Sequence, residues 1–181
     1  MRVFLFSIAL VIASAFPALA DQTDPRLDAL FEELRTGDAI DAELTVARII
    51  EIWSTPQSPT VGVLYDRAKV SADAREYEMA GAILDYAIGL SPNFAQSFAL
   101  RGIVKLAQED AEGALDDFSR ALDLEPRQFE VHMAIAEVLL SRNEKEQAYA
   151  QLQRALEWNP HSEHARDRAR ALLRQISSQE I

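Results

Sequence analysis

The chain has 181 residues, no cysteine, and 29 acidic against 18 basic residues, which give a formal net charge of −11 at pH 7. The lack of cysteine excludes a disulfide framework and a lipid-modified N-terminal cysteine. The acidic balance argues against nucleic acid or an anionic lipid surface as a partner, because both are recognised largely through Lys and Arg.

Residues 1–20 have the layout of a cleavable secretory signal. Arg2 supplies a positive charge, an almost unbroken apolar stretch covers residues 3–16, and Pro17 precedes the small-residue site Ala18-Leu19-Ala20. We therefore expect export, cleavage after Ala20 and a periplasmic mature protein without stable membrane insertion. An uncleaved anchor is the alternative, but the stretch is shorter than the ~20 apolar residues that a membrane span usually needs.

Residues 21–60 predict a degenerate helical hairpin followed by a turn-rich break. Its first helix begins near Asp24 and Pro25 and ends at Gly37, and its second helix ends at Trp53. Apolar stripes run along both helices, at Leu27, Leu30, Phe31 and Leu34, and at Ala42, Val46, Ile49, Ile50 and Trp53. We expect this hairpin to cap the end of the helical array that follows, since such ends need cover. A dedicated partner-binding module is the alternative.

A proline recurs every 34 residues, at Pro92, Pro126 and Pro160, and defines the blocks 61–94, 95–128 and 129–162. Small residues recur at the same positions of each block, where two antiparallel helices must approach closely. A large apolar residue also recurs and fills the space between the helices, and the proline ends the second helix of each block. The repeated positions are Ala68, Gly102 and Ala136; Ala80, Ala114 and Ala148; Leu84, Phe118 and Leu152; and Ala87, Ala121 and Ala155.

This 34-residue helix–turn–helix pattern resembles the tetratricopeptide repeat over residues 61–162. The resemblance implies an all-α, right-handed TPR-like superhelix (α-solenoid) of antiparallel helix pairs, with residues 163–181 as a C-terminal capping helix and tail. In that helix, Ala165, Ala169, Leu172 and Leu173 form the apolar side. We expect Asp110 and Asn143 to be N-caps of second helices.

The first helix of each block departs from the family pattern at several positions. Arg67 and Arg101 stand where the family has leucine, and Ser71 and Lys105 stand where it has tyrosine. His132 occupies the place of a large ring, and we expect it to have a packing role.

The resemblance also implies a concave groove lined by the first helices. Lys69 is the only cation of this set, so the Lys, Asn and Arg clamp by which chaperone-binding members grip a C-terminal carboxylate is absent. The apolar middle suits an apolar peptide segment or helix, although part of the stripe can equally pack between repeats. The implied groove residues are Tyr65, Lys69, Ala99, Ile103, Leu106, Met133, Glu137 and Leu140.

Nothing in the sequence predicts catalysis, a cofactor or a metal site. There is no Gly-rich phosphate loop, and the adjacent acids Asp116 and Asp117 lie on what we expect to be a polar helix face, where they do not converge. His161 and His164 straddle a turn and a helix start without a cysteine to complete a zinc site.

The sequence therefore favours a non-catalytic, periplasmic scaffold or adaptor that binds a protein or peptide of unknown identity. The alternative is a structural protein whose arrays self-associate end to end, which an exposed apolar face on the terminal helices would favour. The charged last helix counts against that alternative.

Overall fold

The computed structural model describes residues 21–178, so the signal predicted at residues 1–20 lies outside the described part of the chain. Within residues 21–178 there are nine α-helices and no strand, which confirms the predicted all-α, TPR-like class. None of these helices is both long enough and apolar enough to cross a bilayer. The helices are α1 (Arg26–Thr36), α2 (Ala39–Trp53), α3 (Pro59–Asp73), α4 (Tyr77–Leu90), α5 (Ala95–Ala107), α6 (Ala111–Leu124), α7 (Phe129–Ser141), α8 (Lys145–Trp158) and α9 (Glu163–Ser177).

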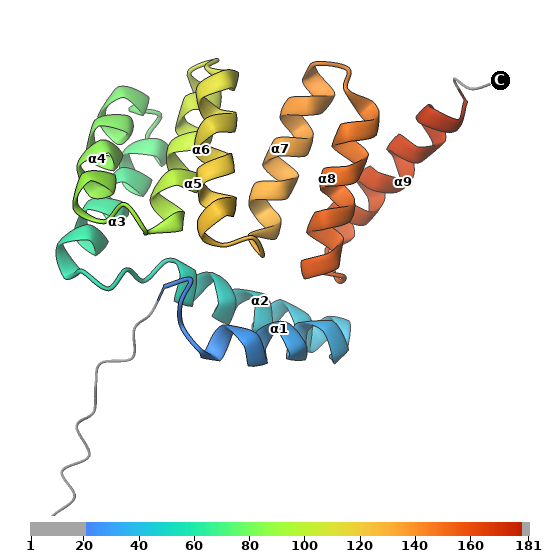
Figure 1. Cartoon of the computed structure of the whole chain (residues 1–181), viewed down its shortest axis with the longest axis horizontal. Helices are drawn as coiled ribbons and strands as arrows, with labels where there is room; N and C mark the ends of the chain where they lie inside the picture. The colour runs from blue at the N-terminus through green and yellow to red at the C-terminus, as the bar shows by residue number, and fades with distance from the viewer. Residues whose placement is uncertain (1–20, 179–181) are drawn as a thin grey trace, which may run out of the picture.

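Each 34-residue block corresponds to one helix pair, α3–α4, α5–α6 or α7–α8, although α3 begins at Pro59, just before its block. The pairs stand side by side in chain order (Figure 1). The helix α9 follows and packs against α8. Leu173, which we expected on the buried side of α9, is 46% exposed. It is exposed because α9 ends the array, and its far side meets no further helix among the described residues.

The repeated small residues lie at the helix contacts. Ala80, Ala114 and Ala148 are completely buried. Gly102 makes the closest approach, since a Cβ atom at this position would lie 2.5 Å from the Phe118 ring. The pattern of small residues is therefore explained by how closely each pair packs.

The turn inside each pair contains one residue in the left-handed region, again at 34-residue spacing. These residues are Arg75, Glu109 and Asn143, with φ values of 62°, 64° and 60°. Asn143 is consequently not the N-cap that the sequence predicted, because the turn needs its backbone in a conformation that asparagine tolerates well. Asp110 does cap α6, and its side chain accepts a hydrogen bond from the Gly113 amide at 2.9 Å.

A buried carboxylate accounts for two departures from the family pattern. Asp117 is 4% exposed, and it lies 2.6 Å from Arg101 and 2.8 Å from Lys105. The expectation that Asp117 faces water on a polar helix face is therefore wrong. The two cations that replace leucine and tyrosine in α5 compensate its charge, and Arg101 also bridges to Asp85 of the preceding pair at 2.6 Å.

His132 is buried, and both of its ring nitrogens lie within hydrogen-bonding distance of an oxygen atom. Its Nδ1 lies 2.7 Å from the Gln151 side-chain oxygen, and its Nε2 lies 3.1 Å from the Pro126 carbonyl. Gln151 follows Asp117 by 34 residues, so the same position of the second helix is polar in two successive repeats. His132 thus joins its helix pair to the preceding inter-repeat turn.

The N-terminal hairpin, formed by α1 and α2, lies across the turns between repeats and does not cap the end of the array (Figure 1). Phe31 packs edge-on against Trp158 at 5.8 Å between ring centres, and Trp53 packs against Phe129 at 5.5 Å. Near the start of the hairpin, the Gln22 side chain donates to the Asn93 carbonyl. The hairpin takes this position because its large aromatic side chains find apolar cover beside the inter-repeat turns.

Arg127 fastens the hairpin at the turn between α6 and α7. Its guanidinium pairs with Glu125 at 2.7 Å and with Asp28 of α1 at 2.7 Å, and it lies 4.8 Å from the centre of the Phe31 ring. The indole of Trp53 donates to Glu125 at 3.3 Å. Segments far apart in the sequence are therefore joined around one buried carboxylate.

The hairpin leaves the outer face of α3 and α4 uncovered by the described residues. Apolar side chains of α3 and α4 are well exposed, most strongly Tyr86 at 72%. The exposed large apolar residues of these two helices are Val63, Val70, Met79, Tyr86 and Leu90.

Candidate binding groove

The groove face is formed by α3, α5 and α7, the first helices of the three pairs. Ile103 is 48% exposed on it, and Lys69 is also exposed. Tyr65 and Ala99 are buried, at 6% and 8% exposure. Leu106, Met133 and Leu140 are half-buried.

The predicted groove residue Glu137 already makes a contact within the protein. Its carboxylate is ion-paired with Arg168 of α9. The last helix therefore reaches back to the groove face and neutralises one of its acids.

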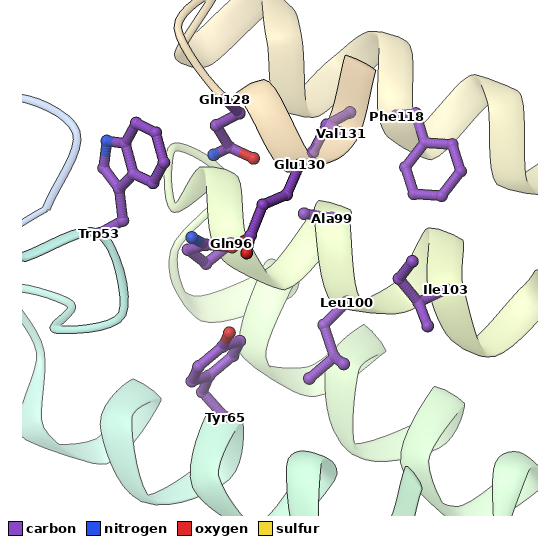
Figure 2. Close-up of a pocket in the computed structure, with 10 residues that line it drawn as sticks. All are labelled: Trp53, Tyr65, Gln96, Ala99, Leu100, Ile103, Phe118, Gln128, Glu130 and Val131. Carbon is purple, nitrogen blue, oxygen red and sulfur yellow. The ribbon is translucent and has the colours of Figure 1, made fainter. Parts of the chain in front are cut away.

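A cavity of about 270 Å³ opens on the groove face between α3, α5 and α7, and we call it the groove pocket. Figure 2 shows its ten lining side chains, which include the predicted Tyr65, Ala99 and Ile103. The remaining five predicted groove residues do not line it. The lining residues are Trp53, Tyr65, Gln96, Ala99, Leu100, Ile103, Phe118, Gln128, Glu130 and Val131.

Two of the polar lining residues occupy equivalent positions in successive repeats, so the repeat pattern could have identified them. Gln96 and Glu130 are 34 residues apart, and each lies one helical turn before a predicted groove residue, Ala99 or Met133. Trp53 and Gln128 carried no such signal. Trp53 reaches the pocket only because the hairpin lies across the turns, and Gln128 belongs to a turn.

Tyr65 forms one wall of the groove pocket, with its hydroxyl directed inward (Figure 2). Its ring packs edge-on against Phe94 at 5.3 Å between ring centres. Burial raises the pKa of Tyr65 to about 12. The phenol is therefore neutral at physiological pH and offers the pocket a polar group without a charge.

Gln128 is the most deeply buried polar residue of the lining, at 2% exposure. Its side-chain nitrogen has no hydrogen-bond partner among residues 21–178. A buried donor left unpaired costs about 1–3 kcal/mol. The Gln128 amide thus gives the pocket an unused hydrogen-bonding group beside Trp53 and Glu130 (Figure 2).

Glu130 projects into the groove pocket from the first turn of α7 (Figure 2). Its side chain is exposed, yet the protein atoms crowded around it limit its hydration, and this desolvation raises the pKa of Glu130 above the ordinary 4.5. No cation or hydrogen-bond donor within the described ranges opposes the shift. Its carboxylate is therefore available to a cation from outside the chain.

The pocket combines an apolar lining with a few convergent polar groups, as ligand sites usually do. Across residues 21–178, no three His, Cys, Asp or Glu side chains are grouped so that they could hold a metal ion. The arrangement is suited to recognising a side chain with its adjoining backbone.

Comparison with known proteins supports the repeat assignment. The family model described as tetratricopeptide repeat matches residues 105–176. A TPR repeat-containing protein of Rhizobium etli is 24% identical over 153 residues, which cover 84% of this chain and 75% of that protein.

Two solved structures are similar in fold. The first TPR of Spaghetti (RPAP3), bound to the HSP90 peptide SRMEEVD, has a TM-score of 0.61 and 15% identity, covering 65% of this chain and 93% of its own. The Yersinia enterocolitica type III secretion chaperone SycD, in complex with a peptide of the translocator YopD, has a TM-score of 0.61 and 20% identity, covering 68% and 97%.

Proposed function

We propose that this chain, whose residues 105–176 match the tetratricopeptide repeat family, is a non-catalytic scaffold that binds a protein or peptide segment in its groove. One observation carries the proposal, namely the groove pocket, which opens where the first helices of the repeats meet. Both structurally similar proteins hold peptides, which supports the same class of ligand here.

Ile103 is the residue through which the proposal is best tested. Its side chain is 48% exposed at the pocket, and such exposed apolar surface contributes to binding roughly in proportion to the area that a partner buries. Ile103→Asp places a charge at the surface that the partner would cover, so binding would have to remove water from that charge. We expect the variant to keep its helicity and to lose its partner.

The experiment compares partner capture by the parent chain, Ile103→Asp and Asp116→Ala, with circular dichroism of each. Asp116→Ala is the control, because Asp116 is exposed on α6 and lies outside the pocket. A folded Ile103→Asp variant that still captures the partner would place the binding surface elsewhere.

The proposed compartment is the periplasm. The support is the sequence of residues 1–20, with its apolar run, Pro17 and the site Ala18-Leu19-Ala20. The intact mass of the protein recovered from a periplasmic extract tests the proposal. A mature chain beginning at Asp21 is expected, and a mass that retains residues 1–20 contradicts cleavage.

Self-association is a second candidate function, and the uncovered outer face of α3 and α4 favours it. At the other end of the array, α9 exposes Arg170 and Arg174, whose burial against an apolar face would cost desolvation energy. The pairing we propose is therefore between two copies of the outer face, which is a closed two-fold arrangement. Sedimentation equilibrium should give a dimer that Tyr86→Glu dissociates; a monomeric parent chain rejects this function.

A further inference from the structure

The size of the groove pocket limits what can enter it. A volume of about 270 Å³ is just below the ~300–1,000 Å³ of sites that enclose a whole small ligand. The apolar lining favours a hydrocarbon or aromatic group. One large apolar side chain is therefore a better match for the pocket than a complete cofactor or a charged metabolite.

The buried amide of Gln128 gives a second constraint. Its nitrogen is unpaired within residues 21–178 although the residue is only 2% exposed. A peptide that inserts a side chain beside Gln128 carries a backbone carbonyl close to that side chain. The unpaired donor thus points to a ligand that has a hydrogen-bond acceptor next to its apolar group.

The charge in the pocket gives the third constraint. Glu130 contributes a carboxylate, whereas the nearby cation Lys69 lies 6.0 Å from the centre of the Tyr65 ring and is not part of the lining. The chain as a whole carries a net charge of −11, which attracts cations at long range. A Lys or Arg beside the apolar side chain would complement Glu130, whereas an acidic segment would be repelled.

The N-terminal hairpin supplies part of this pocket. Trp53 ends α2 and lines the pocket, and Glu125 and Phe129 hold its ring in place. Because Trp53 lies outside the 34-residue blocks, the repeats alone do not complete the pocket.

From these four observations we propose that the groove pocket anchors one large apolar side chain of a partner segment that carries a Lys or Arg directly beside it. The Gln128 amide donates to the partner's backbone, Glu130 pairs with its cation, and Trp53 of the hairpin forms a wall. This inference rests on the proposed function and names the chemistry of the partner.

The test begins with random linear peptides displayed on phage and selected against the purified, immobilised protein. The expected result is a set of enriched peptides that share Phe, Trp, Leu or Met next to Lys or Arg. Enrichment of acidic peptides, of apolar peptides without a basic residue, or of no peptide at all overturns the proposal.

Dissociation constants of the selected peptides are then measured by fluorescence anisotropy against matched variants. Glu130→Lys should weaken binding about tenfold, and Glu130→Gln should weaken it less and reduce its dependence on salt. The control is Glu78→Lys, which makes the same charge reversal at an exposed position of α4 outside the pocket and should change binding less than about twofold.

Gln128→Met separates a binding role from a structural one. Removing an unsatisfied buried donor should raise the melting temperature, while losing the donor should weaken peptide binding. Unchanged binding by this variant shows that the amide does not contact the ligand and overturns its part of the proposal.

Ile103→Asp separates failure of this inference from failure of the proposed function. Peptides that lose affinity for Ile103→Asp but not for Glu130→Lys bind in the groove without the proposed charge pairing, so only the further inference fails. Peptides that bind both variants as tightly as the parent chain reject the groove itself.

Discussion

Trp53 and Glu125 are 72 positions apart in the chain, and the indole nitrogen of the first donates a hydrogen bond to the carboxylate of the second at 3.3 Å. Glu125 also pairs with Arg127, so one carboxylate holds both the end of the hairpin and the turn between two repeats. Since Trp53 lines the groove pocket as well, the stability of the hairpin and the shape of the pocket depend on the same contact.

Replacing Arg127 should therefore destabilise the fold strongly. Glu125 is 2% exposed, and without the guanidinium its charge would be buried and uncompensated. Removing one partner of such a pair typically costs about 3–5 kcal/mol. We expect Arg127→Ala to lower the free energy of unfolding by this amount. Urea denaturation, monitored by tryptophan fluorescence, measures the change.

The matched control is Arg154→Ala. Arg154 pairs with Glu157 at 2.9 Å, but both side chains are more than half exposed, at 64% and 55%. Exposed pairs of this kind contribute about 0–1 kcal/mol. Equal losses in Arg127→Ala and Arg154→Ala would show that Glu125 is not the point at which the hairpin is fastened.

Acid should release the hairpin before it unfolds the repeats. Three of its carboxyls have a lowered pKa: Asp24 through its hydrogen bond with Arg26, Glu33 through its hydrogen bond with Thr45, and Asp38 through backbone amides at the start of α2. A carboxyl with a lowered pKa stabilises the fold above its ordinary value and ceases to do so as the pH falls through its folded value. The hairpin should therefore loosen below the ordinary values of 3.8 for aspartate and 4.5 for glutamate.

Tryptophan fluorescence reports on this release, because Trp53 and Trp158 both contact Phe31 of the hairpin. We expect the fluorescence change to precede the loss of helical circular dichroism as the pH falls. A single coincident transition would mean that the hairpin and repeats unfold together.

The contact between Gly102 and Phe118 makes a direct test of the repeat phasing. A Cβ atom at Gly102 would lie 2.5 Å from the Phe118 ring, so Gly102→Leu must displace the ring or the helix. Overpacking of this kind costs about 1–3 kcal/mol, which chemical denaturation would detect. The matched control is Gly89→Leu, because Gly89 is exposed on α4 and a Cβ atom there meets nothing within 4 Å. Equal stability of the two variants would show that the phasing is misassigned.

The periodic sequence predicted the helix pairs well because each pair is held by contacts between neighbouring segments, such as Gly102 with Phe118. The position of the hairpin was not predictable in this way. It depends on where Phe31 and Trp53 find apolar cover, and Phe129 and Trp158 provide that cover far away in the sequence. The same non-local packing brings Trp53 to the groove pocket.

Asp117 shows a different limit of sequence reasoning. An aspartate between a second acid and a large apolar residue looks like part of a polar face, but the burial of Asp117 depends on cations in another helix. Arg101 and Lys105 were visible as departures from the family pattern, yet the pattern alone did not say which charge they compensate.

The ion pairs of Asp117 predict that a single substitution destabilises the fold, whereas replacing all three charged residues together does not. Asp117→Ala should cost roughly 2 kcal/mol, because Arg101 and Lys105 lose their buried partner but remain partly accessible to water. Replacing a whole buried ionic group by apolar residues of similar size is often neutral or stabilising.

The chain itself provides the apolar replacements at the matching positions of its other repeats, namely Ile135, Leu139 and Ile83. The triple variant Arg101→Ile, Lys105→Leu and Asp117→Ile should therefore be at least as stable as the parent chain in urea denaturation, whereas Asp117→Ala alone should be less stable than the parent. Asp85 loses its bridge to Arg101 in this variant, but its side chain is 67% exposed and water replaces the lost contact. A triple variant that is less stable than the parent would show that the ionic group contributes net stability to the second repeat.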